Sequence, residues 1–174
     1  MSKKIFIIED EEGILYGLQD HFTSDGYSVE ISSADEELED LLGRIKKTKP
    51  NYIILDLVLP KLDGLEVLKR IKNDNETADI QVLIFTDLSD EDSRTRSVGL
   101  GANFYFLKSE MDVTEFADHV EKIMGNKQVS DASAEDAEEN DLVLNNSYFK
   151  LLPAGCWQPV IFLLLFRISN YFDF

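Results

Sequence analysis

The chain has 174 residues, of which 44% are apolar, and a formal net charge of −17 at pH 7. That length suits one domain with a real core and an appendage. The negative charge argues against direct binding of DNA or RNA and against anionic membrane surfaces, because those partners are bound through Lys and Arg. The single cysteine, Cys156, excludes an internal disulfide framework and fits a reducing compartment.

Neither end of the sequence predicts export or a membrane span. The N-terminal apolar run, residues 5–8, is too short for the core of a signal peptide. The longest apolar run near the C-terminus, residues 160–166, is far below the ~20 residues of a transmembrane helix. We therefore expect a cytoplasmic protein with no membrane span.

Short apolar runs alternate with stretches of helical periodicity from residue 2 to residue 125. The first helical stretch, for example, repeats Ile14, Leu18 and Phe22 at helical spacing. This regular alternation predicts a parallel sheet with right-handed crossovers and helices on both faces, a doubly wound three-layer α/β domain. The five runs expected to be strands are residues 5–8, 27–32, 52–55, 81–86 and 104–107.

Local signals place several helix starts. Asp112 is the expected N-cap of the last helix. The helix at residues 90–98 has almost no apolar stripe, so we expect it to be mostly exposed and loosely held. Two other helix starts match a capping box: Ser33 with Glu36, and Ser89 with Asp92.

The composition changes after residue 125. Residues 126–141 are rich in acids and poor in apolar side chains, which predicts a disordered linker. Residues 142–174 form an apolar, aromatic tail without a helical stripe. A partner-binding peptide and a segment that is not a native element are both open interpretations of this tail.

Chemically active residue types follow four of the predicted strands. Because the carboxyl ends of parallel strands meet at one edge of the sheet, these side chains are expected to lie together. They are Glu9 and Asp10 after the first strand, Asp56 after the third, Thr86 at the end of the fourth and Lys108 after the fifth.

Three carboxylates held together repel one another unless a cation intervenes. Mg²⁺ fits, because it is commonly held by one or two carboxylates with water and phosphate oxygens. With the metal present, a phosphoryl group becomes favourable and Asp56 can act as the nucleophile that carries it. Thr86 then supplies a hydroxyl and Lys108 a positive charge for phosphoryl oxygens.

The sequence resembles the receiver domain of bacterial two-component response regulators, of the chemotaxis-regulator type. The matching stretches are K-K-I-F-I-I-E-D-E, I-I-L-D-L-V-L-P-K-L-D-G, V-L-I-F-T and G-A-N-F-Y-F-L-K, within residues 3–124. The resemblance implies a flavodoxin-like sheet of order 2-1-3-4-5. It also implies a signalling switch, not an enzyme, that promotes its own aspartyl phosphorylation and dephosphorylation.

By the same resemblance, Asp56 accepts phosphate from a sensor histidine kinase or a phosphotransfer protein. Output then passes to a downstream protein through the fourth helix, fifth strand and fifth helix. Mg²⁺ would be bound by the side chains of Asp10 and Asp56 and the carbonyl of Val58, with Glu9 assisting through water. Thr86 and Tyr105 would be the switch pair, and Lys108 would contact the phosphate.

Two residues depart from the family pattern. Asp87 follows Thr86 where Ala, Ser or Gly is usual, and its carboxylate is expected to repel an incoming phosphoryl donor. Ser109 follows Lys108 where Pro is usual, so a trans peptide and a strained loop are both open there. Asp87 keeps a second hypothesis open, a pseudo-receiver that acts as a constitutive protein-binding module.

Other interpretations of the sequence have less support. A flavodoxin-like cofactor protein would need a phosphate-binding loop where Glu9 and the acids after it stand. An aspartate-based phosphohydrolase would need a second Asp where Val58 stands. His21 and His119 have no second metal ligand at a recognisable spacing, so we expect them to be surface or packing residues.

Overall fold

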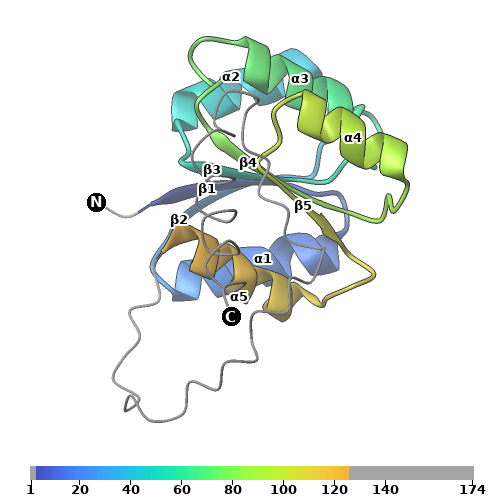
Figure 1. Cartoon of the computed structure of the whole chain (residues 1–174). Helices are drawn as coiled ribbons and strands as arrows, with labels where there is room; N and C mark the ends of the chain where they lie inside the picture. The colour runs from blue at the N-terminus through green and yellow to red at the C-terminus, as the bar shows by residue number, and fades with distance from the viewer. Residues whose placement is uncertain (1–2, 126–174) are drawn as a thin grey trace, which may run out of the picture.

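The computed structural model describes residues 3–125, in which strands and helices alternate along the chain (Figure 1). The linker expected at residues 126–141 and the tail expected at 142–174 lie outside the described residues. The elements, in chain order, are β1 (Lys4–Ile8), α1 (Glu12–Ser24), β2 (Ser28–Ser32), α2 (Leu38–Thr48), β3 (Tyr52–Leu55), α3 (Gly64–Asn73), β4 (Gln81–Thr86), α4 (Glu91–Gly99), β5 (Phe104–Leu107) and α5 (Val113–Met124).

All five strands are parallel, in the order β2-β1-β3-β4-β5. The predicted doubly wound, flavodoxin-like architecture is confirmed. β1 and β3 lie side by side in the middle of the sheet, with Ile8 opposite Leu55 at their carboxyl ends. The residues that follow these two strands therefore emerge next to each other.

Side chains alternate between two apolar cores, one on each face of the sheet. Helices α1 and α5 cover one face, and α2, α3 and α4 cover the other (Figure 1). Ile5 and Ile7 of β1 point to the first core, and Phe6 and Ile8 point to the second. Because both faces are covered, the strands are continuous apolar runs, as a parallel sheet requires.

Helix α5 is fixed to its face by aromatic packing and by its caps. The ring of Phe116 stacks on Phe85 of β4 with centroids 3.9 Å apart. The predicted N-cap Asp112 is confirmed, and it forms a reciprocal capping box with Glu115. Gly125 closes the helix at a φ of 70°, a conformation that glycine adopts at little cost.

Both capping boxes predicted with serine are wrong. Helix α2 begins at Leu38 without a side-chain cap, because the Glu36 carboxylate accepts hydrogen bonds from Arg44 at 2.6 Å and Ser32 at 2.7 Å instead. Helix α4 is capped one residue later than expected, by Asp90, whose side chain accepts from the Ser93 N–H at 2.8 Å.

Helix α4 has the mostly exposed surface that the sequence predicts. Its two buried side chains are Ser93 and Ser97, and the Ser97 hydroxyl donates to the Ser93 carbonyl at 2.8 Å. Such a helix buries little apolar area on the sheet, so hydrophobic packing holds it less firmly than its neighbours. No helix within residues 3–125 is long and apolar enough to cross a membrane.

Candidate functional site

The acidic site, formed by Glu9, Asp10 and Asp56, lies at the carboxyl edge of the sheet. Carboxylate oxygens of all three residues lie within 4.8 Å of one another, as the sequence predicts. Glu9 and Asp56 are 2% and 3% exposed, whereas Asp10 is exposed to solvent. The site therefore has two buried acids at its base and one accessible acid at its mouth.

Backbone hydrogen bonds of the sheet hold the two buried acids in place. The Asp56 N–H donates to the Ile8 carbonyl at 3.0 Å, which continues the β1–β3 ladder by one residue. The Glu9 N–H donates to the Ser32 carbonyl at 3.0 Å, which continues the β1–β2 ladder in the same way. Both acids are thus held by the hydrogen-bond ladders of the sheet.

Lys108 supplies the positive charge of the site. Its Nζ lies 2.7 Å from Oδ2 of Asp56 and 2.9 Å from Oε2 of Glu9, and its side chain is 8% exposed. The Lys108 N–H donates to the Thr86 carbonyl at 2.9 Å, so the residue is positioned by the β4–β5 ladder. One ammonium group bridges two carboxylates that would otherwise repel each other.

The protonation behaviour of the site follows from its burial. Burial raises the pKa of Glu9 to about 7, against the opposing effect of Lys108 and with a further contribution from Asp56. Burial alone would lower the pKa of Lys108, but its hydrogen bonds to Asp56 and Glu9 outweigh it and raise that pKa. The lysine thus stays charged, and Glu9 titrates near neutrality.

The loop from β3 to α3 shapes one wall of the site. The Val58 N–H donates to Oδ1 of Asp56 at 3.0 Å, and the Val58 side chain is exposed. Val58 also forms a β-bridge with Asp63, the N-cap of α3. Gly64 is needed here, because a Cβ at that position would lie 2.5 Å from the Leu57 Cα.

Thr86 and Tyr105 are both buried, and the backbone of Leu88 connects them. The Leu88 N–H makes a long 3.4 Å contact to Oγ1 of Thr86, and its carbonyl accepts from the Tyr105 hydroxyl at 2.7 Å. The Arg94 guanidinium of α4 lies over the Tyr105 ring, 5.2 Å from its centroid. Burial raises the pKa of Tyr105 to about 12, so the hydroxyl remains a donor.

The structure therefore brings together all the residues that the sequence predicts at this edge. It adds Leu88, which acts through its backbone and so leaves no signal in side-chain chemistry. It also adds Arg94, whose contact with Tyr105 depends on how α4 packs on the sheet. Asp87 and Ser109 are both exposed. Since no peptide bond within residues 3–125 is cis, the Lys108–Ser109 bond is trans.

Comparison with known families decides the identity of this arrangement. The family model described as "Response regulator receiver domain" matches residues 5–138. The chain belongs to this family. Receiver domains are the signalling switches of two-component response regulators, and they bind Mg²⁺ at an acidic pocket of this kind.

Two relatives from Bacillus subtilis show the range of the family. The alkaline phosphatase synthesis transcriptional regulatory protein PhoP is 32% identical over 156 residues, covering 88% of this chain but 62% of its own length. Sporulation initiation phosphotransferase F is 33% identical over 124 residues, covering 71% of this chain and 95% of its own length. The chain thus spans about three fifths of the longer relative and nearly all of the shorter one.

Solved receiver structures have the same fold. The Mn²⁺-bound form of response regulator Rcp1 aligns with a TM-score of 0.62 and 25% identity, covering 75% of this chain and 99% of that one. The phosphorylated cyanobacterial phytochrome response regulator RcpA aligns with a TM-score of 0.62 and 25% identity, covering 78% and 100%. The donor set of the acidic site fits a hard divalent cation, because it offers carboxylate oxygens close together.

Proposed function

We propose that this receiver domain accepts a phosphoryl group on Asp56 from a sensor histidine kinase or a phosphotransfer protein. The observation that carries the proposal is the environment of that carboxylate. Oδ2 is 2.7 Å from the Lys108 ammonium and Oδ1 is 3.0 Å from the Val58 N–H, so the side chain is oriented toward the mouth of the site. A buried, oriented carboxylate beside a fixed cation is suited to form an acyl phosphate.

In the proposed reaction, an Asp56 carboxylate oxygen forms a bond to the phosphorus of a phosphohistidine. The phosphorus–nitrogen bond breaks, and the imidazole nitrogen leaves with the bonding electron pair and takes up a proton from solvent. Lys108 remains charged throughout and moves from the carboxylate to a phosphoryl oxygen.

Mg²⁺ would be held by the side chains of Asp10 and Asp56 and the carbonyl of Val58, with Glu9 assisting through water. When bound, it would neutralise charge on the phosphoryl oxygens. The closeness of the three carboxylates supports this assignment. The exposure of Asp10 supports it further, because that acid lies where a hydrated ion enters.

The switch would run from Thr86 to Tyr105 through Leu88. A phosphoryl oxygen on Asp56 is a strong acceptor that draws in the Thr86 hydroxyl, and the Leu88 backbone would then shift with it. A switch pair in which Tyr105 turns inward only on activation does not fit, because its ring is already buried here and its hydroxyl is bonded to the Leu88 carbonyl. Phosphorylation would therefore strengthen the contacts of a Tyr105 side chain that already points inward.

The output surface is proposed to be the α4–β5–α5 face, with a downstream protein as its partner. Helix α4 supports this, because it buries only two serines and touches Tyr105 through Arg94. PhoP is named as a transcriptional regulator, but the chain covers 62% of it. The net charge of −17 supports signalling through a protein and not through direct contact with nucleic acid.

A small phosphodonor such as acetyl phosphate, supplied with Mg²⁺, tests the proposal on the full chain. We expect one acid-stable, base-labile phosphate on the wild type and none on Asp56→Asn. Asp20→Asn is the matched control, because Asp20 is an exposed acid on α1 and its variant should label normally. Labelling of Asp56→Asn would refute the assignment, and a wild type that never labels would favour the pseudo-receiver hypothesis.

A further inference from the structure

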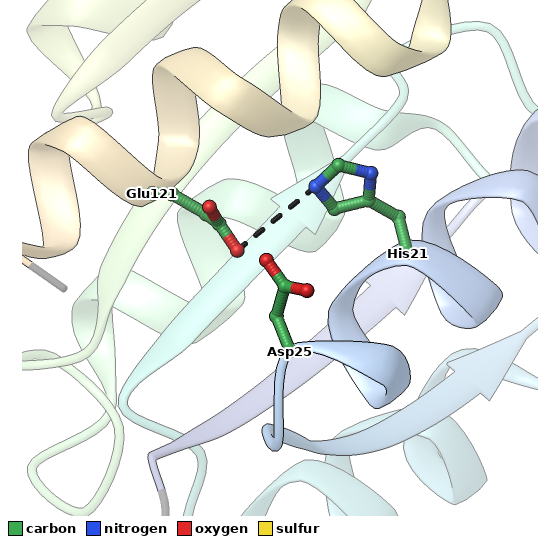
Figure 2. A group of neighbouring side chains, drawn as sticks. All are labelled: His21, Asp25 and Glu121. Atoms are coloured by element: carbon green, nitrogen blue, oxygen red, sulfur yellow. Dashed lines mark ion pairs between the residues drawn. The ribbon is translucent and has the colours of Figure 1, made fainter. Parts of the chain in front are cut away.

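A second cluster of metal-binding residue types lies at the amino edge of the sheet, away from Asp56. We name it the α1–α5 cluster: His21 and Asp25 at the end of α1 and Glu121 in the last turn of α5 (Figure 2). One ring nitrogen and one oxygen from each acid lie within 4.8 Å of one another. Two helices far apart in the sequence thus present three donor atoms to one point.

The contact between His21 and Glu121 is too long for a direct hydrogen bond. His21 Nε2 lies 3.9 Å from Oε1 of Glu121. Figure 2 marks this contact with a dashed line. This nitrogen is buried, and it makes no hydrogen bond to any residue between 3 and 125. The Glu121 side chain is 3% exposed. A buried imidazole nitrogen and a buried carboxylate that face each other across this gap are spaced for an ion between them.

The surroundings favour a cation at this position. Helices α1 and α5 both end here, and the negative ends of their dipoles face the cluster. His21 and Asp25 are four residues apart, so they lie on the same side of α1. The His21 ring also packs edge-on against the buried Phe22 ring, with centroids 5.6 Å apart, which limits its rotation.

We propose that His21, Asp25 and Glu121 bind a divalent transition-metal ion of the Zn²⁺ class. An imidazole with two carboxylates suits Zn²⁺, whereas the all-oxygen acidic site suits Mg²⁺. Zinc ligands at about 2.0–2.2 Å from the ion lie about 3.3–3.6 Å apart in a tetrahedron, so the 3.9 Å separation requires only a small side-chain movement. Asp25 is exposed, which leaves the fourth position to water.

Such an ion would tie the end of α1 to the end of α5. The last turn of α5 is also held by the Lys3 ammonium, which donates to the Met124 carbonyl. Since α5 belongs to the proposed output face, the metal would fix one end of that face while phosphorylation acts at the other. The metal site itself does not depend on phosphorylation.

The test is a Zn²⁺ titration of the full chain in excess Mg²⁺, followed by calorimetry and by NMR of the imidazole nitrogens. The chain contains two histidines, which makes the NMR readout direct. We expect one tight site and a large Zn²⁺-induced shift of His21 Nε2, with the His119 signals unchanged. The His21→Gln variant should lose more than about tenfold in affinity.

Matched variants separate the site from general charge and from folding. His119→Gln and Asp20→Asn should bind Zn²⁺ as the wild type does, whereas Asp25→Asn should bind more weakly. Because Asp25 is exposed, that variant remains informative if Glu121→Gln fails to fold. Equal affinity of His21→Gln and wild type would overturn the proposal. Loss of Zn²⁺ binding in Cys156→Ser alone would also overturn it, because the ion would then be bound by the cysteine. An unshifted His21 NMR signal would overturn it too, since His21 would then only pair with Glu121.

Discussion

The carboxyl edge and the amino edge of the sheet each contain a buried glutamate, but they compensate its charge differently. Glu9 and Glu121 are both 2% exposed. Glu9 has a lysine ammonium at 2.9 Å, whereas Glu121 faces an imidazole nitrogen at 3.9 Å. A lysine is charged at every physiological pH, whereas a neutral imidazole contributes no charge of its own and can instead bind a metal cation.

The difference shows how the fold distributes chemistry. Parallel strands all end at the carboxyl edge, so acids and a lysine that directly follow strands converge there with fixed geometry. At the amino edge two helices end together. The possible metal ligands there come from the ends of these helices, and no common sequence pattern marks their positions. The Lys108 ammonium gives the first edge a permanent counter-charge, whereas at the second edge Glu121 faces a side chain that can bind a metal ion.

The largest expected effect comes from removing that permanent counter-charge. Lys108→Met should lower the free energy of unfolding by about 3–5 kcal/mol at pH 8 without divalent cations, because it leaves two buried carboxylates uncompensated. Added Mg²⁺ should restore part of the loss. Urea denaturation measures both effects.

A surface ion pair provides the control for this variant. Lys69 pairs with Glu66 at 3.0 Å, and both side chains are exposed. Lys69→Met should therefore cost less than about 1 kcal/mol. Equal losses of unfolding free energy in the two variants would show that the Lys108 ammonium stabilises the fold no more than a surface ion pair does.

The next effect is the pH dependence that Glu9 contributes. Its pKa is about 7 in the folded protein against an ordinary value of 4.5, so the folded state keeps a proton that the unfolded chain releases. The stability of the wild type relative to Glu9→Gln should be greatest below pH 4.5 and should fall by up to about 3 kcal/mol as the pH rises through 7.

This difference is measured by denaturation of both proteins across the pH range in the presence of EDTA. Glu12→Gln, which changes an exposed acid on α1, should follow the wild type at every pH. A constant difference between wild type and Glu9→Gln from pH 4 to pH 8 would contradict the raised pKa.

A third effect separates the roles of two acids in metal binding. Asp10→Asn should weaken Mg²⁺ binding by more than about 100-fold, because a direct carboxylate ligand is lost. Glu9→Gln should weaken it by about tenfold, as expected for a group that acts through water. A Mg²⁺ titration that gave equal affinities for the two variants would remove this division of roles.

The fold and the acidic site are both accessible to sequence reasoning, for a shared physical reason. Buried parallel strands are continuous apolar runs, so their ends are visible in the sequence, and Glu9, Asp56 and Lys108 can be placed at one edge from their positions after those runs. The helix starts are less accessible. Glu36 could equally cap α2 or pair with Arg44, and only the tertiary structure decides between these bonds.

The α1–α5 cluster could not be predicted in this way. His21 and Glu121 are 100 positions apart in a sequence where neither follows a strand. Their approach depends on how α1 packs on α5, which periodicity does not specify. Without that information the sequence predicts an ordinary surface or packing role for His21, whereas the structure places the carboxylates of Asp25 and Glu121 beside it.

The smallest expected effect compares one exposed acid at each edge. Asp87 directly follows Thr86 at the carboxyl edge, whereas Asp25 lies at the amino edge, and both are exposed. Replacing either with Ala changes the net charge of the protein equally. Only Asp87 is adjacent in the chain to Thr86 and so to the proposed phosphorylation site, where a screened charge would be worth about 0.5–1 kcal/mol.

Asp87→Ala should therefore speed phosphorylation by acetyl phosphate about two- to fivefold, and Asp25→Ala should leave the rate unchanged. The gain should shrink as salt is added, because the repulsion acts through solvent. If both variants accelerate equally, the effect comes from net charge and not from position. If neither does, the carboxylate of Asp87 points away from the path of the donor, and the departure from the family pattern at this residue has no consequence for the rate.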